Sequence, residues 1–275
     1  MVVMKTMIRK SMLYQTKVEY GDYTMNHVQG CAHGCKYPCY AMMMAKRFGK
    51  VASYEEWCQP VLVSNTLELL DKELPRLKDK ISNVQLCFTT DSFMYGYDDI
   101  CEMSKKAILR INREGIPCVV LSKGVLPADL ASPGFSKENV YGITLVSLDE
   151  HYREEYEPGA APYEERIAAL KTLHKAGCKT WVSMEPYPTP NIVEQDLASI
   201  LEVVSFADRI IFGRTNYNKV VSAFPNSKAW YNDRVLEVVS FCEGRGIDWY
   251  VKRGTWTGVG PMSSNCMKPF ARIAG

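Results

Sequence analysis

The sequence predicts an α/β fold, a partial (β/α)6-type TIM barrel with parallel strands. Short apolar runs recur along the chain, and amphipathic helical segments separate them. The length of 275 residues suits a single large domain. A closed eight-stranded barrel commonly takes about 250 residues or more. Six or seven strands can be counted here, which favours an open barrel.

Each element has its own signal. The predicted strands are 23–29, 84–90, 117–122, 140–147, 179–184, 209–212 and 247–251. The first helix is predicted to follow Pro38, which suits a first helical position, and to end at Gly49. Asn65 and Glu68 have the spacing of an N-cap with its return acid, so a second helix is predicted there.

The later helices are predicted from the same kinds of start and end signals. They are predicted to span 99–115 and 162–177, to begin at Asn191, and to begin at Asn232 and end near Gly244. Regular alternation of strands and helices indicates parallel strands joined by right-handed crossovers.

Composition limits the classes of function. Hydrophobic residues make up 47% of the chain, and the formal net charge is +2, so nucleic-acid binding would need a local basic patch. The first residues lack the pattern of a signal peptide, and apolar runs are shorter than the roughly 20 residues of a membrane span. We expect a cytoplasmic protein of one domain, residues 1–275, with its core at about 20–253 and a tail at 254–275.

A cysteine-rich loop is the strongest chemical signal. Cys31, Cys35 and Cys39 have the spacing C-x3-C-x3-C. Thiolates are soft donors that suit iron–sulfur clusters, and three of them can hold three irons of a cubane while the fourth iron stays open. A structural zinc site with His33 as the fourth ligand is the alternative. The loop by itself does not decide between the two.

Polar groups follow every predicted strand, at the end where barrel enzymes carry their function. After the cysteine loop these groups are Thr89, Thr90, Asp91, Lys123, Ser147, Glu185, residues 214–216, Lys252 and Arg253. Such a ring could bind a zwitterionic ligand with ribose and a base. Glu185 lies in a proline-stiffened loop that indicates a site facing cofactor or substrate. Asp91 could equally cap the turn that follows it.

Taken in order, these motifs resemble the radical S-adenosylmethionine enzymes, and more specifically the spore photoproduct lyase-like (DNA repair photolyase-like) group. The resemblance covers most of the chain. It is carried by Gly30 to Ala41 with its three cysteines, Thr90-Asp91, Lys123-Gly124, the stretch from Ser147 through Glu157-Pro-Gly-Ala to Arg166, and Gly177.

The resemblance implies a [4Fe–4S] cluster on Cys31, Cys35 and Cys39, with S-adenosylmethionine on the open iron. Reductive cleavage would give a 5′-deoxyadenosyl radical that abstracts hydrogen from a substrate. The implied cofactor-binding residues are Tyr37, Tyr40, Thr90, Asp91, Lys123 and Ser147. An external electron donor of the flavodoxin or ferredoxin type is also implied.

Two departures from the family pattern bear on the reaction. Pro38 is an extra residue in the last cysteine spacing. The nearest match to the lyase's hydrogen-donating cysteine is Cys87, which strand alternation places on the same face as Thr89 and deeper in the barrel. Cys87, as this nearest match, and Glu185, from its proline-stiffened loop, are the candidate catalytic residues.

Three classes of substrate remain open: a nucleic-acid lesion, a peptide and a small molecule. The near-neutral net charge does not support the nucleic-acid lesion. Two other classes of protein compete with an enzyme. One is a non-catalytic zinc-binding module. The other is a partner-dependent subunit in which residues 256–275 cover the barrel mouth or engage another chain.

Overall fold

An eight-stranded sheet forms the centre of the computed structural model, which describes residues 4–16 and 21–258. Its strands are β2 (Leu13–Gln15), β3 (Tyr23–Met25), β6 (Val84–Leu86), β7 (Cys118–Ser122), β8 (Val140–Thr144), β9 (Lys179–Tyr187), β10 (Arg209–Arg214) and β11 (Asp248–Val251). From β3 to β11 the strands lie in chain order and pair in parallel, and β2 adds an antiparallel edge. The predicted partial barrel is confirmed.

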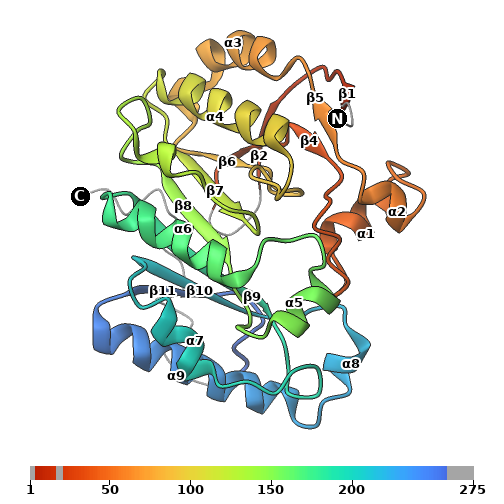
Figure 1. Cartoon of the computed structure of the whole chain (residues 1–275), viewed down its shortest axis with the longest axis vertical. Coiled ribbons are helices and arrows are strands. Elements are labelled where there is room, and N and C mark those ends of the chain that lie inside the picture. The colour runs from red at the N-terminus through yellow and green to blue at the C-terminus, as the bar shows by residue number, and fades with distance from the viewer. Residues whose placement is uncertain (1–3, 17–20, 259–275) are drawn as a thin grey trace.

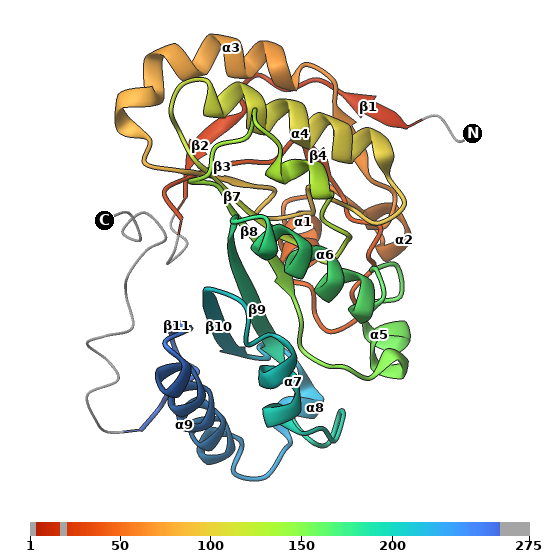
Figure 2. The ribbon, with the colours of Figure 1, turned by 60° about the vertical axis from the view of Figure 1, so that its left-hand side comes forward.

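Helices lie around this sheet, some on its outer face and others beside the cysteine loop (Figures 1 and 2). They are α1 (Tyr40–Arg47), α2 (Tyr54–Trp57), α3 (Thr66–Leu77), α4 (Asp98–Asn112), α5 (Glu150–Tyr156), α6 (Tyr163–Lys175), α7 (Leu197–Val203), α8 (Lys219–Ser222) and α9 (Ser227–Arg245), with short 3-10 turns at Lys78–Lys80 and Ala128–Ala131. α3 packs on α4, α6 on β8 and β9, and α9 on β10 and β11. Parallel strands require such crossovers.

The chain also forms a small second sheet that the sequence pattern did not predict. β1 (Lys5–Met7) pairs in parallel with β5 (Val61–Val63), and β4 (Val28–Gln29) pairs with β5 in the antiparallel sense. The predicted strand 23–29 is therefore divided. Its first part belongs to the barrel and its end leads into the cysteine loop from the small sheet.

Two apolar layers lie on the two faces of the barrel sheet. The larger core fills the space between sheet and helices. The inner cluster consists of Val119, Val140, Trp181, Ile211 and Tyr250. Gly142 makes room for it, because a Cβ atom there would lie 2.3 Å from Trp181 Nε1. The inner face below the strand ends is thus filled by side chains.

Several predicted helix starts are wrong, and at one of them a different polar residue caps the backbone. α7 begins after Asp196, whose carboxylate accepts hydrogen bonds from two amides of the first turn, and not at Asn191. Asn232 lies inside α9, which follows Asn226. Cys39, not Pro38, precedes α1. Asn65 does precede α3, but its side chain bonds to the backbone of Arg9.

β9 and β10 end later than predicted, at Tyr187 and Arg214, so Glu185 lies within β9 and not in a loop after the strand. Two other strands end earlier than predicted, and both of these differences move a candidate site residue. β6 ends at Leu86 because Cys87 takes a positive φ of 50°. β8 ends at Thr144, so Ser147 lies beyond the strand. None of the helices in the described residues combines the length and apolar character needed to cross a membrane. Most of the predicted tail, residues 259–275, lies outside the described ranges.

Candidate functional site

A cavity of about 720 Å³ opens at the carboxyl ends of the parallel strands. Nine of the predicted site residues line it: Cys31, Cys35, Tyr37, Cys39, Tyr40, Thr90, Asp91, Lys123 and Glu185. Arg214, Asn216, Lys252 and Arg253 line it too. The fold therefore brings together residues from six separate strand ends, as a barrel active site requires.

The three cysteines share one wall of this cavity and are all half-buried. Burial raises the pKa of Cys31 well above its usual value, and the neighbouring Cys35 and Asp91 add to the effect. Burial also raises the pKa of Cys35 to about 12, although the charge of Lys123 acts in the opposite direction. Such thiols lose their protons when a metal binds them, because the thiolate is the ligand.

The donor set fits an iron–sulfur cluster. In such clusters each thiolate binds its own iron, so the three sulfurs need not meet at one point. Within residues 4–16 and 21–258, no three His, Cys, Asp or Glu side chains are grouped so that they could hold a single metal ion.

His33, the possible fourth ligand of a zinc site, is buried and has both ring nitrogens occupied. The Tyr95 amide donates to Nε2 at 3.1 Å, and Nδ1 lies 3.4 Å from Asp91 Oδ2. Burial lowers the pKa of His33 to about 4 despite the opposing charge of Asp91, so the ring is neutral. The neutral ring accepts at Nε2 and donates from Nδ1. It has no lone pair left for a zinc ion.

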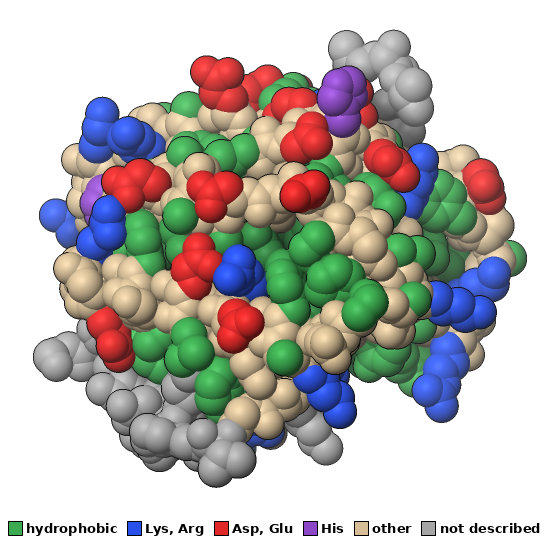
Figure 3. Space-filling model, turned by 90° about the horizontal axis from the view of Figure 1, so that it is seen from below, with side chains coloured by type: hydrophobic (Ala, Val, Ile, Leu, Met, Phe, Trp, Pro, Cys, Tyr) green, Lys and Arg blue, Asp and Glu red, His purple; other side chains and the backbone are tan. Residues whose placement is uncertain are grey.

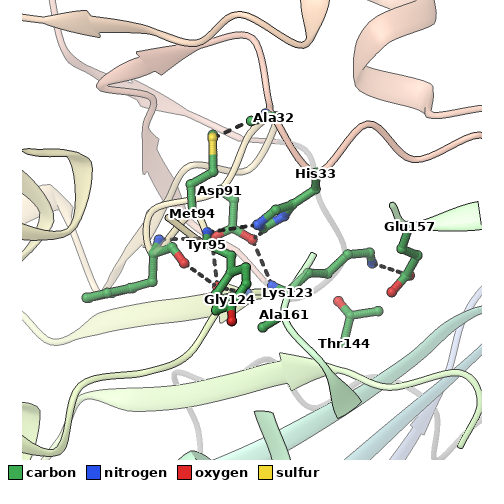
Figure 4. A network of polar contacts seen from close by, with 12 residues as sticks. Ala32, His33, Asp91, Met94, Tyr95, Lys123, Gly124, Thr144, Glu157 and Ala161 are labelled. Carbon is green, nitrogen blue, oxygen red and sulfur yellow. Dashed lines mark hydrogen bonds and ion pairs between the residues drawn. The ribbon is translucent and has the colours of Figure 1, made fainter. Parts of the chain in front are cut away.

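Asp91 connects three segments of the site. Its Oδ1 accepts from the Phe93 amide at 2.9 Å and the Ser122 hydroxyl at 2.8 Å. Its Oδ2 accepts from the Lys123 amide at 2.8 Å and faces His33. This carboxylate joins the cysteine loop to the ends of β6 and β7 (Figure 4). Of the two roles left open for Asp91, the contacts favour the structural one.

Glu157 is the centre of a buried charge network. Its Oε1 accepts from Tyr37 at 2.6 Å and lies 3.4 Å from Lys123 Nζ, while Oε2 accepts from Arg166 Nη1 at 2.9 Å. Burial favours the neutral acid, but the charges of Lys123 and Arg166 and the two hydrogen bonds lower the pKa of Glu157 to about 2. Figure 4 shows the ammonium group of Lys123 directed at this carboxylate.

The segment that carries Glu157 also packs on the cysteine loop. The Gly159 amide donates to the His33 carbonyl at 3.0 Å, and the Lys36 amide donates to the Tyr156 carbonyl at 2.8 Å. A Cβ atom on Gly159 would lie 2.0 Å from the Ala32 carbonyl oxygen. The loop is thus fixed by backbone contacts on one side and by Tyr37 on the other.

Cys87 does not line the cavity. Its Sγ lies 3.4 Å from His27 Nδ1, and His27 Nε2 lies 2.8 Å from the Ser104 hydroxyl. That hydroxyl donates to the Ser92 carbonyl at 2.5 Å, so it accepts from Nε2, and Nδ1 accepts from the thiol. Burial lowers the pKa of His27 to about 4 and raises that of Cys87 to about 12. Both groups are neutral.

Ser147 is buried outside the cavity lining, where its hydroxyl accepts from the Asp149 amide at 3.0 Å. Thr144 and Ser183 line the cavity in its place and are register partners on β8 and β9. Sequence reasoning missed them because the apolar residues after Thr144 appeared to continue the strand. A small polar residue within an otherwise apolar strand was the available signal.

The far wall of the cavity carries a second charged pair. Lys252 Nζ lies 3.6 Å from Glu185 Oε2. Gly213 lies beside them, and a Cβ atom there would be 2.9 Å from Glu185 Cγ and 3.0 Å from Lys252 Cγ. At the mouth, the rings of Tyr40 and Tyr217 stack with centroids 6.4 Å apart, and these side chains are 52% and 67% exposed.

The face seen in Figure 3 shows acidic and basic side chains interspersed among hydrophobic ones. This distribution agrees with the near-neutral net charge. It gives no support to a broad basic surface on the described part of this face.

Comparison with known sequences places the chain in a family. Residues 25–204 match the Radical SAM superfamily. The chain belongs to this superfamily. The matched part includes the three cysteines and the strand ends from β3 to β9. A curated relative, "Uncharacterized protein ORF301" of Acidianus two-tailed virus, is 24% identical over 66% of this chain. The match spans 61% of that relative's length.

Solved structures show the same fold in spore photoproduct lyase. The lyase complexed with dinucleoside spore photoproduct covers 89% of this chain and 80% of its own, with 16% identity and a TM-score of 0.62. A mutant lyase with the same dinucleoside has 15% identity, the same coverage and a TM-score of 0.65. At this identity the likeness concerns the fold, which agrees with the partial barrel described above.

Proposed function

We propose that this protein is a radical S-adenosylmethionine enzyme in which Cys31, Cys35 and Cys39 hold a [4Fe–4S] cluster. The supporting observation is that these three thiols share one cavity with the polar ends of the parallel strands. When bound, the cluster would supply the electron that cleaves S-adenosylmethionine to methionine and a 5′-deoxyadenosyl radical. An external one-electron donor of the flavodoxin or ferredoxin type would supply that electron in the reducing cytoplasm.

Residues near the cysteines would prepare the cluster side of the cavity. The charge of Lys123 opposes the rise in the pKa of Cys35 that burial causes, and in this way favours the thiolate. Glu157 holds Lys123 and Tyr37 in place through its ion pair and hydrogen bond. Thr90 is tied to the Val28 carbonyl at 3.3 Å and keeps its hydroxyl at the cavity wall.

The remaining lining would bind the organic part of the cofactor and the substrate. The hydroxyl groups of Thr144, the last residue of β8, and of Ser183, in the middle of β9, can donate to or accept from polar atoms. The exposed ring of Tyr40 offers a flat surface for an adenine. Glu185, across the cavity, can accept from an amine or hydroxyl group.

The non-catalytic zinc module is less well supported. Its fourth ligand was to be His33, whose two ring nitrogens already bond to Tyr95 and Asp91. A zinc ion would then have three cysteines and no histidine, and the polar strand ends would have no role.

The test begins with protein purified without oxygen and reconstituted with iron and sulfide. With dithionite and S-adenosylmethionine, we expect 5′-deoxyadenosine, measured by chromatography. Cys31→Ala, Cys35→Ala and Cys39→Ala should each abolish it, whereas the control Cys178→Ala, at a half-buried thiol away from the cavity, should retain it. A colourless preparation that retains zinc and yields no product would contradict the proposal.

A further inference from the structure

A second, smaller cavity of about 150 Å³ adjoins the proposed active site. Arg214, Thr215, Asn216 and Tyr217 line both cavities. The rest of the small cavity is lined by Val221, Ser222, Ser227, Lys228, Tyr231, Thr255 and Thr257. Among the described residues, this lining holds two cations and several hydroxyl groups and contains neither Asp nor Glu. Its chemistry is that of an anion site.

Arg214 is held in the wall by irregular backbone. The register between β9 and β10 shifts between Phe212 and Arg214, and such bulges commonly redirect a side chain beside an active site. The Arg214 amide donates to the Thr255 hydroxyl at 3.1 Å. Arg214 Nη2 lies 3.6 Å from where a Cβ atom on Gly254 would be, so the absence of a side chain there leaves room for the guanidinium.

The guanidinium of Arg214 has an unused donor. Its Nε is buried and has no hydrogen-bond partner among the described residues. A buried donor without a partner costs about 1–3 kcal/mol. Because Nε has no exposed surface, a ligand in the cavity would contact the terminal nitrogens of the guanidinium, and Nε could donate to it only after a small movement of the side chain.

The first turn of α9 forms the opposite side of the cavity through Ser227 and Lys228. α9 is 19 residues long, and neither a capping side chain nor an acidic residue is found in its first turn. The preceding residue, Asn226, has φ of 53° and does not cap the helix with its side chain. The Ser227 amide donates to the Phe224 carbonyl at 3.3 Å, but the next amides of the first turn and the helix dipole at such an end favour an anion.

We propose that this cavity is a subsite for a phosphoryl group carried by the substrate. Four lining hydroxyls already donate within the protein, those of Thr215, Ser222, Tyr231 and Thr257. The donors left around the cavity are the guanidinium, Lys228, the hydroxyls of Ser227 and Thr255, and the helix end. That arrangement suits a tetrahedral oxyanion better than a flat carboxylate. The inference rests on the proposed function, because the adjoining cavity is where the substrate would react. Tyr217, common to both cavities, would lie beside the part of the substrate nearest the phosphoryl group.

The test is a calorimetric titration of the full-length, cluster-loaded protein with inorganic phosphate, with acetate as the carboxylate comparison. We expect saturable binding of phosphate and much weaker binding of acetate. Arg214→Gln and Lys228→Gln should each weaken phosphate binding about tenfold, the effect of losing roughly 1.4 kcal/mol. The matched control is Lys219→Gln, at an exposed lysine of α8 outside the cavity lining, which should bind like the unchanged protein.

Equal phosphate affinity in all four proteins, or acetate binding as tight as phosphate, would overturn the subsite. Two further ligands identify the source of the phosphoryl group. Tighter binding of thymidine monophosphate than of phosphate supports a nucleotide substrate, and tighter binding of glucose 6-phosphate supports a sugar phosphate.

The two proposals fail separately. Formation of 5′-deoxyadenosine without phosphate binding rejects only the subsite. Phosphate binding without 5′-deoxyadenosine rejects only the radical chemistry.

Discussion

The hydroxyl group of Tyr37 donates to the carboxylate of Glu157 at 2.6 Å, across 120 residues of sequence. Tyr37 lies between the second and third cysteines, so this bond fixes the middle of the cysteine loop to the segment before α6. The same carboxylate binds Lys123 and Arg166. A single buried anion therefore joins the cysteine loop, the end of β7 and α6.

Replacing the Glu157 carboxylate should lower the stability of the folded protein. Glu157→Gln leaves Lys123 and Arg166 without their shared partner in a buried site, where breaking such a pair typically costs about 3–5 kcal/mol. We expect a loss of this size in the free energy of unfolding, measured with urea. Glu154→Gln is the control, because Glu154 is 64% exposed and should change stability by less than about 0.5 kcal/mol. Equal effects of the two variants would contradict the network.

His27 should make stability depend on pH. Burial lowers its pKa to about 4 from an unfolded value of 6.5, so between these values the unfolded chain binds a proton that the folded chain does not. This contribution is fully present above pH 6.5 and is lost as the pH falls toward 4. His27→Gln should reduce the slope of unfolding free energy against pH in this window by up to one proton, about 1.4 kcal/mol per pH unit. His151→Gln, at an exposed histidine, should leave the slope unchanged.

Gly159 should be required for the cysteine loop. In Gly159→Ala the new methyl group would lie 2.0 Å from the Ala32 carbonyl, so the loop or the segment after α5 must move. We expect less bound iron per chain after reconstitution and lower thermal stability. Gly244→Ala is the matched control, since a Cβ there meets nothing within 4 Å and alanine favours the helix by about 0.5–1 kcal/mol. A full iron content in Gly159→Ala would contradict the proposed packing role.

Cys87 should be dispensable for cleavage of the cofactor. Its thiol bonds to His27 and does not line the cavity. Cys87→Ala should therefore form 5′-deoxyadenosine at a rate within about twofold of the unchanged protein, since a change that small corresponds to less than about 0.5 kcal/mol. Loss of product with an intact cluster would restore Cys87 as a candidate catalytic residue.

The sequence predicted the order of the parallel strands and the ring of strand ends, because both follow from apolar periodicity and chain order. It predicted the grouping of Thr90, Lys123 and Glu185 for the same reason. It could not distinguish Thr144 from Ser147, since the apolar residues between them pack in the outer core and resemble a continuing strand.

The sequence also could not predict contacts between segments that are far apart along the chain. Glu157 and Arg166 belong to the stretch that carries the family resemblance, but only the fold shows that both are fully buried. The helix starts at Asn191 and Asn232 were wrong because nearby polar residues, Asp196 and Asn226, precede the helices instead. A local sequence pattern identifies every residue at which a helix could begin, whereas tertiary packing determines the residue at which it does begin.

The stacked rings of Tyr40 and Tyr217 have a consequence for how a substrate is held in the cavity. Tyr40 begins the helix after the cysteine loop, and Tyr217 follows β10 near the opposite edge of the barrel. Their contact joins the segment after the third cysteine to the segment after β10, which are more than 170 residues apart in sequence. A substrate held against this wall would touch both rings at once, so replacing either tyrosine should alter its binding from both sides of the cavity.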